Sequence, residues 1–298
     1  MKKNTVATLA EKKARGERIS QLTCYDYSTA RLMDEAGVDT ILVGDSLGMT
    51  MQGNQDTLVV TMEEMIVYGR SVTRACENAF VIIDMPFMSY QISVEQAVAN
   101  AGRLVKEGGA NAVKLEGGAS VCDRIRAITA CGIPVCAHVG MTPQSCNAMG
   151  GFKVQGKGAD GARRVLEDAL AVQEAGAFMV VLECVPPKLA ALITRKLDVI
   201  TIGIGAGDGC DGQVLVWQDM LGLGDRVPKF VKRFAEVGQV MKDAFRAYDT
   251  AVKAGAFPAP EHTYSKSDCS DLELARLDRT VGRPTERTAY YMQGGTMG

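Results

Sequence analysis

Several features that define other classes of protein are missing from this sequence. It has 298 residues but no apolar run near the roughly 20 residues that cross a bilayer as a helix, so we expect no membrane partner. The segment after Met1 is charged rather than apolar, so we expect no signal peptide. The 33 Lys and Arg residues are interspersed with 35 Asp and Glu residues, which argues against a nucleic-acid-binding surface.

Paired cysteine motifs are missing as well. The sequence has nine cysteines, yet no two of them form a Cys-x-x-Cys pair. This absence argues against a zinc ribbon and against thioredoxin-type chemistry. An odd number of scattered cysteines is typical of free thiols in a reducing compartment, so we expect a cytoplasmic protein.

What is present is the composition of an ordinary globular protein, with 47% hydrophobic and 23% charged residues. Short apolar segments, each bounded by breakers or charges, predict eight strands. They lie at residues 19–24, 41–46, 80–84, 112–115, 134–139, 178–183, 199–204 and 214–217. Helix-length segments separate the first seven strands, whereas the link from the seventh to the eighth is too short for a helix.

This alternation predicts the fold class. Residues 19–254 match the roughly 250 residues of a (β/α)₈ barrel. We therefore predict an α/β fold of the TIM-barrel type over residues 1–262, with an N-terminal helix at 5–17. A long amphipathic helix is predicted at 228–254. The sequence changes character after it, and we expect residues 263–298 to form a C-terminal extension that is partly flexible.

Helix starts and long loops can be placed from local signals. Ser28, Thr61 and Ser93 each precede a helical pattern and are predicted N-caps. Two long loops, 47–60 and 140–158, follow predicted strands directly. Loops at strand ends often carry function, so we expect both to cover a site.

Polar side chains stand at the ends of otherwise apolar strands. Since the carboxyl ends of the strands of a parallel barrel meet at one rim, these side chains are predicted to converge. They are Asp45, Ser46, Asp84, Lys114, Glu116, His138 and Glu183. A weak repeat supports this register, because Glu116 and Glu183 each fall nine residues after a Glu that ends a helix. Gly44 holds the matching position of the second strand, so this strand leaves space there and presents its acid one residue later.

Three of these carboxylates suggest a metal site. Asp45, Asp84 and Glu116 would repel one another in one pocket and raise each other's pKa values, and a divalent cation removes that cost. Ligands that are all oxygen suit Mg²⁺ or Mn²⁺ better than zinc. The alternative is that the three acids are separate helix caps or salt-bridge partners, and the pattern favours neither.

Other polar residues also have two interpretations. Lys114 either binds a substrate carboxylate or forms an ion pair with Glu116. Glu183, after an apolar strand, is either a general base or the partner of a lysine across the barrel. His138 is interpreted as a hydrogen-bonded core residue rather than a catalyst. The glycines of 203–207 resemble a phosphate cradle, but close backbone packing is the preferred explanation.

A set of motifs in a fixed order goes further than any single residue. Together they resemble the ketopantoate hydroxymethyltransferase family, over about residues 3–262. The motifs are Thr23-Cys24-Tyr25-Asp26, Val43-Gly44-Asp45-Ser46-Leu47-Gly48, Asp84-Met85-Pro86-Phe87, Val113-Lys114-Leu115-Glu116-Gly117-Gly118, His138-Val139-Gly140, Leu182-Glu183-Cys184-Val185-Pro186, Gly203-Ile204-Gly205-Ala206-Gly207 and Asp211-Gly212-Gln213.

The resemblance implies a barrel of the phosphoenolpyruvate/pyruvate type and a defined reaction. A hydroxymethyl group would pass from 5,10-methylenetetrahydrofolate to 3-methyl-2-oxobutanoate, which gives 2-dehydropantoate (ketopantoate) for pantothenate biosynthesis. Mg²⁺ or another divalent cation would assist formation of the enolate. Members of this family form homo-oligomers, commonly decamers.

The resemblance also implies roles for individual residues. Asp45 and Asp84 would hold the metal, with Glu116 in its shell through water. Asp45, Ser46, Asp84 and Lys114 would contact the oxo acid, and Glu183 would be the general base.

Two other functions remain open at this stage. One is a Mg²⁺-dependent lyase or decarboxylase of the same superfamily that acts on a 2-oxo acid without folate. The other is a barrel kept as a scaffold or regulatory binding protein, which the presence of Lys114, Glu116 and Glu183 argues against.

Overall fold

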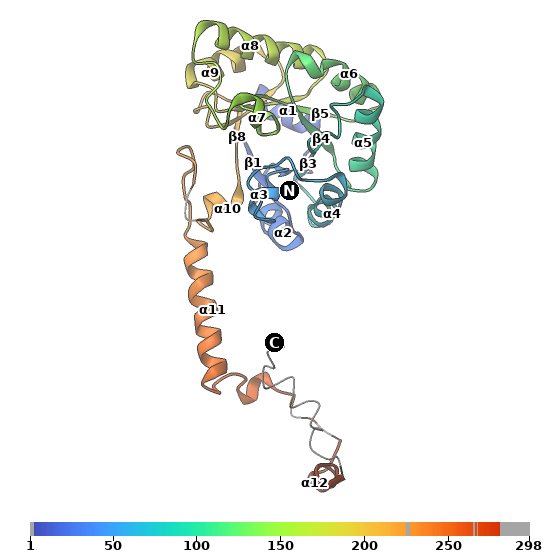
Figure 1. The fold of residues 1–298 in the computed structure, drawn as a ribbon, viewed down its shortest axis with the longest axis vertical. Coiled ribbons are helices and arrows are strands. Elements are labelled where there is room, and N and C mark those ends of the chain that lie inside the picture. Colours follow the sequence, from blue (N-terminus) through green and yellow to red (C-terminus); the bar gives the residue numbers. More distant parts are fainter. Residues whose placement is uncertain (1–2, 225–226, 265, 267, 281–298) are drawn as a thin grey trace, which may run out of the picture. The chain divides into compact units, whose positions relative to one another are not determined.

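Eight parallel strands close into a barrel in the order of the sequence (Figure 1). The computed structural model describes residues 3–224, 227–264, 266 and 268–280. The strands are β1 (Ile19–Thr23), β2 (Thr40–Val43), β3 (Phe80–Asp84), β4 (Ala112–Glu116), β5 (Val135–Gly140), β6 (Met179–Glu183), β7 (Ile200–Ile204) and β8 (Gly212–Leu215). Pairing of β8 with β1 closes the sheet, so the predicted (β/α)₈ fold is confirmed.

Helices precede, connect and follow the strands, and most of them surround the barrel (Figure 1). They are α1 (Val6–Ala14), α2 (Tyr27–Glu35), α3 (Leu47–Thr50), α4 (Met62–Thr73), α5 (Val94–Lys106), α6 (Cys122–Ala130), α7 (Cys146–Met149), α8 (Ala159–Glu174), α9 (Pro187–Lys196) and α10 (Trp217–Met220). The link 205–211 between β7 and β8 contains no helix, as its length predicted. No helix in the described residues is long and apolar enough to cross a membrane.

The predicted helix starts are correct at two of three positions. Thr61 caps α4 in a capping box with Glu64, and Ser93 caps α5. The prediction for α2 is wrong, because its N-cap is Asp26 rather than Ser28. Asp26 has an extended backbone and its carboxylate accepts a hydrogen bond from a first-turn N–H group, which starts the helix earlier.

The last predicted helix of the barrel starts later than its pattern indicates. The pattern predicts residues 228–254, but α11 spans Val237–Lys253. The residues before it are held by α10 instead, because the N–H groups of Phe234 and Val237 donate to the carbonyls of Met220 and Leu221. Apolar spacing alone cannot reveal that competition.

The chain divides into two compact units, one up to Gln239 and one from Val240 onward. The second unit also contains α12 (Asp271–Thr280). The predicted division into a barrel at 1–262 and an extension at 263–298 stays a prediction. Residues 265, 267 and 281–298 of that extension lie outside the described residues.

Strand alternation fills the barrel interior with apolar side chains. The interior cluster includes Ile82 of β3, Val181 of β6 and Ile202 of β7, and it also contains Leu9 of α1. The opposite faces of the strands pack against the helices in a second cluster. Because side chains alternate with a period of two, polar residues at the strand ends continue the inward-facing rows.

Leu9 tests whether α1 contributes to the barrel core. Its side chain is fully buried, whereas that of Leu32 on α2 is 60% exposed. Leu9→Ala is expected to lower the free energy of unfolding by about 2–5 kcal/mol, because it leaves a cavity in the interior cluster. The matched variant Leu32→Ala is expected to change it by less than about 0.5 kcal/mol. Urea unfolding followed by circular dichroism measures both, and equal effects would show that α1 is not part of the core.

Candidate active site

A cavity of about 500 Å³ opens at the carboxyl ends of the strands. This volume is typical of small-molecule sites. All the polar strand-end residues singled out from the sequence line it, so their predicted convergence is confirmed. They are Asp45, Ser46, Asp84, Lys114, Glu116, His138 and Glu183.

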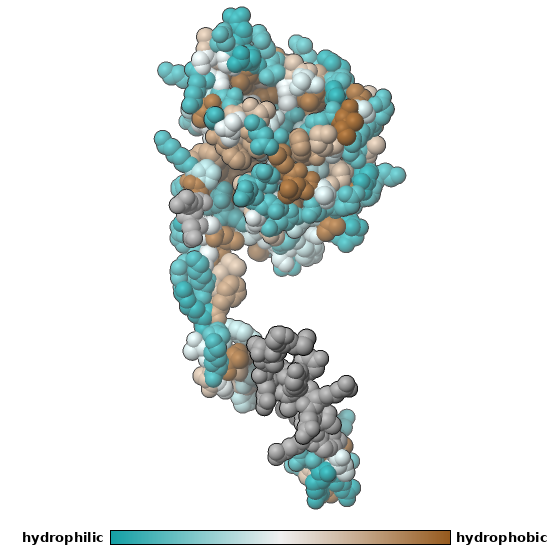
Figure 2. Space-filling view, viewed as in Figure 1, coloured by the Kyte–Doolittle hydropathy of each residue, from teal (hydrophilic) through white to brown (hydrophobic). Residues whose placement is uncertain are grey.

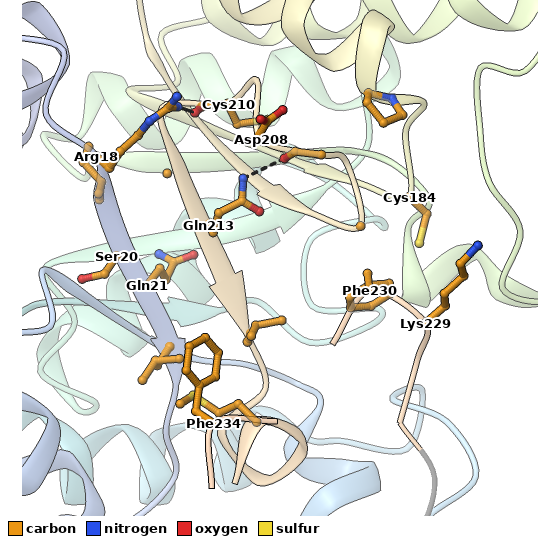
Figure 3. Close-up of a pocket in the computed structure, with 18 of the residues that line it drawn as sticks. Arg18, Ser20, Gln21, Cys184, Asp208, Cys210, Gln213, Lys229, Phe230 and Phe234 are labelled. Atoms are coloured by element: carbon orange, nitrogen blue, oxygen red, sulfur yellow. Dashed lines mark hydrogen bonds between the residues drawn. The ribbon is translucent and has the colours of Figure 1, made fainter. Parts of the chain in front are cut away.

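A larger groove of about 1060 Å³ lies beside β1, β7 and β8 (Figure 3). Its lining includes Arg18, Gln213, Phe230 and Phe234 but none of the clustered strand-end carboxylates. Gln213 donates a hydrogen bond to the carbonyl of Gly207 there. We therefore take the smaller cavity as the candidate active site, because the polar residues at the strand ends converge there and do not line the larger groove.

Strand register explains why the acids and the lysine meet. Asp84 of β3 pairs in register with Lys114 of β4, and Glu116 of β4 pairs with His138 of β5. Lys114 and Glu116 are two residues apart, so both face the interior. Asp45 follows the end of β2, and its N–H group donates to Asp84 Oδ2 at 3.0 Å.

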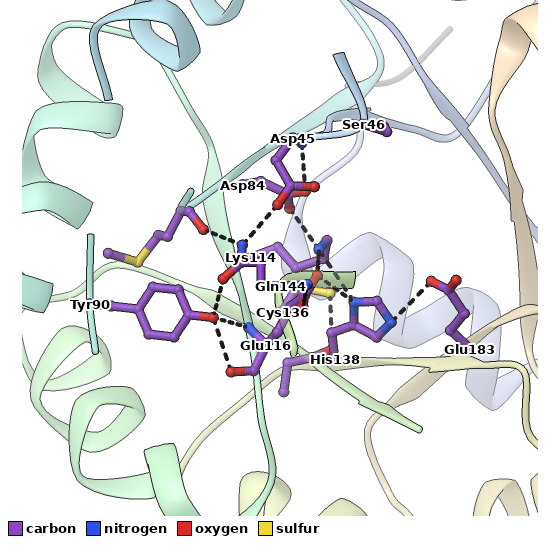
Figure 4. Close-up of polar contacts among 12 residues, drawn as sticks. Asp45, Ser46, Asp84, Tyr90, Lys114, Glu116, Cys136, His138, Gln144 and Glu183 are labelled. Atoms are coloured by element: carbon purple, nitrogen blue, oxygen red, sulfur yellow. Dashed lines mark hydrogen bonds and ion pairs between the residues drawn. The ribbon is translucent and has the colours of Figure 1, made fainter. Parts of the chain in front are cut away.

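The closest partner of Lys114 is Asp84, not Glu116. Lys114 Nζ lies 2.9 Å from Asp84 Oδ1 and 4.0 Å from Glu116 Oε1 (Figure 4). Burial lowers the pKa of Lys114, but the charges of Asp84, Glu116 and Asp45 outweigh burial and hold the pKa above its ordinary value. Lys114 is therefore an ammonium ion at neutral pH.

Gln144 joins two of the acids and was missed in the sequence. Its Nε2 donates to Asp45 Oδ2 at 2.8 Å, and its backbone N–H donates to Glu116 Oε2 at 2.9 Å. The hydroxyl of Tyr90 donates to Gln144 Oε1 at 2.7 Å, and it accepts a bond from the N–H of Glu116. The only sequence signal for Gln144 was its place in the 140–158 loop, which follows a strand end.

The acids differ in how burial affects them. Burial raises the pKa of Asp45 well above its usual value, and the charges of Asp84 and Glu116 add to the effect. Burial also raises the pKa of Asp84, although Lys114 opposes it. The pKa of Glu116 is lowered, because hydrogen bonding to His138 and the charges of His138 and Lys114 outweigh burial. The Asp45–Asp84 pair is therefore where negative charge is least compensated.

His138 bridges two carboxylates (Figure 4). Its Nε2 lies 3.3 Å from Glu183 Oε2 and its Nδ1 lies 3.5 Å from Glu116 Oε1. Burial and the Lys114 charge lower the pKa of His138, but Glu116 and Glu183 raise it more, to about 9. The side chain is buried, as predicted for a core histidine, yet it pairs with the proposed base. Among the described residues, the ion-pair partner of Glu183 is His138 rather than a lysine.

The site contains carboxylates that could bind a cation, but they are not arranged as a complete set of metal ligands. Within the described residues, no group of three or more His, Cys, Asp or Glu side chains is arranged to hold a metal ion. Glu116 and both oxygens of Asp84 are engaged by protein groups, as described above. Gly44 keeps space beside Asp84, because a Cβ there would lie 2.8 Å from Ser46 Oγ and 3.5 Å from Asp84 Oδ2. Asp45, which forms no ion pair within the described residues, and this space beside Asp84 fit a divalent cation.

The glycines after β7 serve close packing. A Cβ on Gly203 would lie 3.0 Å from Cys210 Sγ, and one on Gly207 would lie 2.7 Å from the Cβ of Pro187. Gly205 and Gly207 also have positive φ angles, of 62° and 80°, which favour glycine. The structure thus provides a packing reason for these glycines.

Solved structures share this fold at low sequence identity. A 2,3-dimethylmalate lyase of the PEP mutase/isocitrate lyase superfamily is 15% identical, with a TM-score of 0.56, and the match covers 97% of this chain and 99% of that one. A phosphonopyruvate hydrolase, solved as a complex with oxalate and Mg²⁺, is 14% identical with a TM-score of 0.56 and covers 99% of each chain. These likenesses concern the fold alone.

Sequence comparison is more specific. The 3-methyl-2-oxobutanoate hydroxymethyltransferase of Clostridium novyi is 60% identical over 272 residues, which cover 91% of this chain and 98% of that one. The enzyme of the same name from Enterococcus faecalis is 59% identical over 267 residues, 89% of this chain and 97% of the relative. The family model for ketopantoate hydroxymethyltransferase matches residues 3–260. The chain therefore belongs to the ketopantoate hydroxymethyltransferase family.

Proposed function

We propose that this chain transfers a hydroxymethyl group from 5,10-methylenetetrahydrofolate to 3-methyl-2-oxobutanoate, giving 2-dehydropantoate for pantothenate biosynthesis. The observation that carries the proposal is the cluster in the barrel mouth, where Lys114, Asp45 and Asp84 face Glu183 across one cavity. Family membership and the names of the close relatives support the same reaction.

The oxo acid binds at the charged end of the cavity in this proposal. Lys114 supplies a buried ammonium for the substrate carboxylate, and Ser46 supplies a hydroxyl whose Oγ is 2.8 Å from Tyr25 OH. Asp45 and Asp84 would contact the same substrate and would hold a divalent cation, with Glu116 as a further carboxylate for it. When bound, the cation stabilises the negative charge that develops on the keto oxygen.

Glu183 acts as the general base. A C–H bond beside a ketone is a weak acid, so a carboxylate must be held next to it. His138, which is protonated at neutral pH, orients Glu183 through the 3.3 Å contact. Glu183 takes the proton from C3 of the oxo acid. C3 then forms a bond to the one-carbon unit of the folate, and water supplies the oxygen of the hydroxymethyl group. The bonds from that carbon to N5 and N10 break, the two nitrogens take up the proton from C3 and one from the water, and tetrahydrofolate leaves.

The quaternary state and location of the protein are also proposals. We propose a homo-oligomer, which for this family suggests a decamer. Helix α11 buries no residue, and its exposed apolar residues form one side of an amphipathic helix (Figure 2). The cysteines from Cys24 to Cys210 are free thiols, which suits the reducing cytoplasm.

The base assignment can be tested without folate. Glu183→Gln is expected to slow deuterium exchange at C3 of 3-methyl-2-oxobutanoate by about 10²–10⁴-fold, because the amide cannot accept the proton. Proton NMR in deuterated buffer with Mg²⁺ measures the exchange. The exposed Glu167→Gln on α8 is the matched control and is expected to exchange like the wild type. Exchange by Glu183→Gln at the wild-type rate would show that another group is the base.

The Asp45 carboxylate tests the cation site. Asp45→Ala is expected to weaken binding of Mg²⁺ and of the oxo acid together, each by at least about tenfold, since it removes a proposed ligand. Titration calorimetry measures both, and circular dichroism checks that the barrel still folds. Asp198→Ala, at an exposed position, serves as control. Loss of oxo-acid binding with unchanged Mg²⁺ binding would contradict the shared role.

His138 should make stability depend on pH. Its pKa is about 9 in the folded chain and roughly 6.5 when unfolded, so the folded state prefers the proton. That contribution is complete below pH ~6.5 and is lost as the pH rises towards 9. His138→Gln is expected to lose less stability than the wild type as the pH rises from about 6.5 to about 9. His262→Gln, which changes an exposed histidine, is expected to lose as much stability as the wild type. The midpoints of urea unfolding are measured for each variant at pH 6 and at pH 9.5, in the presence of a chelator. If His138→Gln loses as much stability between these two pH values as the wild type does, the prediction is wrong.

An assay without the folate co-substrate distinguishes this reaction from that of a folate-independent lyase. Product formation from the oxo acid is expected to require methylenetetrahydrofolate, and its occurrence without folate would favour the lyase.

A further inference from the structure

The mouth of the active-site cavity is lined by apolar side chains, whereas its floor is lined by charged ones. Met49, Phe152 and Phe230 line it, with side chains that are 38%, 55% and 37% exposed. They come from three segments of the chain, after β2, β5 and β8, and Met49 lies in α3. Figure 2 shows apolar surface on the face of the barrel unit where Figure 1 places α3 and α7. Exposed apolar side chains around a cavity indicate a ligand surface.

Asp219 of α10 is the acid in this mouth. It lines the same cavity, and its carboxylate forms no hydrogen bond or ion pair within the described residues. Burial raises the pKa of Asp219, with the charge of Arg233 acting in the opposite direction. A half-buried carboxylate without donors is costly to a protein unless a ligand supplies them. The mechanism derived above gives this residue no role.

Lys229 adds a cation to the same rim. It is exposed, lines the cavity and forms no ion pair in the part of the chain that the structure describes. Figure 3 shows it on the same segment as Phe230. The rim therefore combines a carboxylate, flat apolar side chains and an ammonium group.

The ligand that matches this set has three parts. Reduced folates carry a pyrimidinone edge with two adjacent N–H donors, flat rings and a tail that ends in carboxylates. Two parallel N–H groups match the two oxygens of a carboxylate, as in bidentate guanidinium pairs. A flat ring packs well on aromatic side chains. The cavity of about 500 Å³ also has room for a second ligand beside the small oxo acid.

We propose that Asp219 binds the 2-amino-pyrimidinone edge of the folate, that Phe152 and Phe230 pack on its rings, and that Lys229 pairs with its tail carboxylates. This assignment rests on the proposed function, because it presumes a folate co-substrate. It places the one-carbon donor over the charged floor, where the oxo acid is held by Lys114. The two substrates then approach from opposite ends of one cavity.

Asp219→Asn tests the assignment. It keeps the size of the side chain but replaces one acceptor oxygen by a donor that opposes the folate N–H groups. The Km for methylenetetrahydrofolate and the Kd for tetrahydrofolate are expected to rise by about 10- to 100-fold. Deuterium exchange at C3 of the oxo acid, which needs no folate, is expected to stay at the wild-type rate. Asp208→Asn, at an exposed position outside this cavity, is the matched control.

A folate analogue gives a second, independent readout. The wild type is expected to bind 2-desamino-2-methyl-tetrahydrofolate at least about tenfold more weakly than tetrahydrofolate, because one N–H donor group is missing. Asp219→Asn is expected to bind tetrahydrofolate and the analogue with similar affinity. A merely structural defect would weaken the binding of both ligands and would leave the difference between them.

Each outcome decides one question. Unchanged folate affinity of Asp219→Asn in a chain whose wild type is folate-dependent would overturn this assignment and leave the proposed function intact. Loss of C3 exchange in Asp219→Asn would also overturn it, since the residue would then serve the oxo acid or the fold. A wild type that forms product without folate would overturn the proposed function itself.

Discussion

The ion pair between Asp84 and Lys114 is the interaction on which the site depends. Both side chains are almost fully buried, and their charged atoms are 2.9 Å apart. Removing such charges from water costs several kcal/mol per ion unless partners are supplied. Here Asp84 also accepts the N–H of Asp45, and Lys114 holds Glu116 within reach. The site is therefore a network in which each charge depends on its neighbours.

The 140–158 loop completes this network from outside the barrel. Gln144 donates to both Asp45 and Glu116, and Tyr90 fixes the amide of Gln144. The position of the loop and the position of the acids are thus coupled. The predicted role of this loop as a lid stays a prediction.

The charged groups of the site are arranged in a way that suits the removal of a proton from carbon. Least-compensated negative charge lies at Asp45 and Asp84, where a cation is proposed. Glu183 lies beyond His138, which holds its carboxylate at 3.3 Å. Acid and base functions are therefore separated by the environment of each group rather than by its residue type.

Sequence alone determined the barrel and the rim that carries the site, because a period of two and the breakers at strand ends are local properties. It also identified Gly44 as a gap beside Asp45. Only the tertiary structure decided that Asp84 is the closest ion-pair partner of Lys114 and that His138 bridges two acids. It also decided that Gln144 belongs to the site. Gln144 and Asp45 are 99 residues apart, so their contact depends on how distant loops meet above the barrel, which no local pattern encodes.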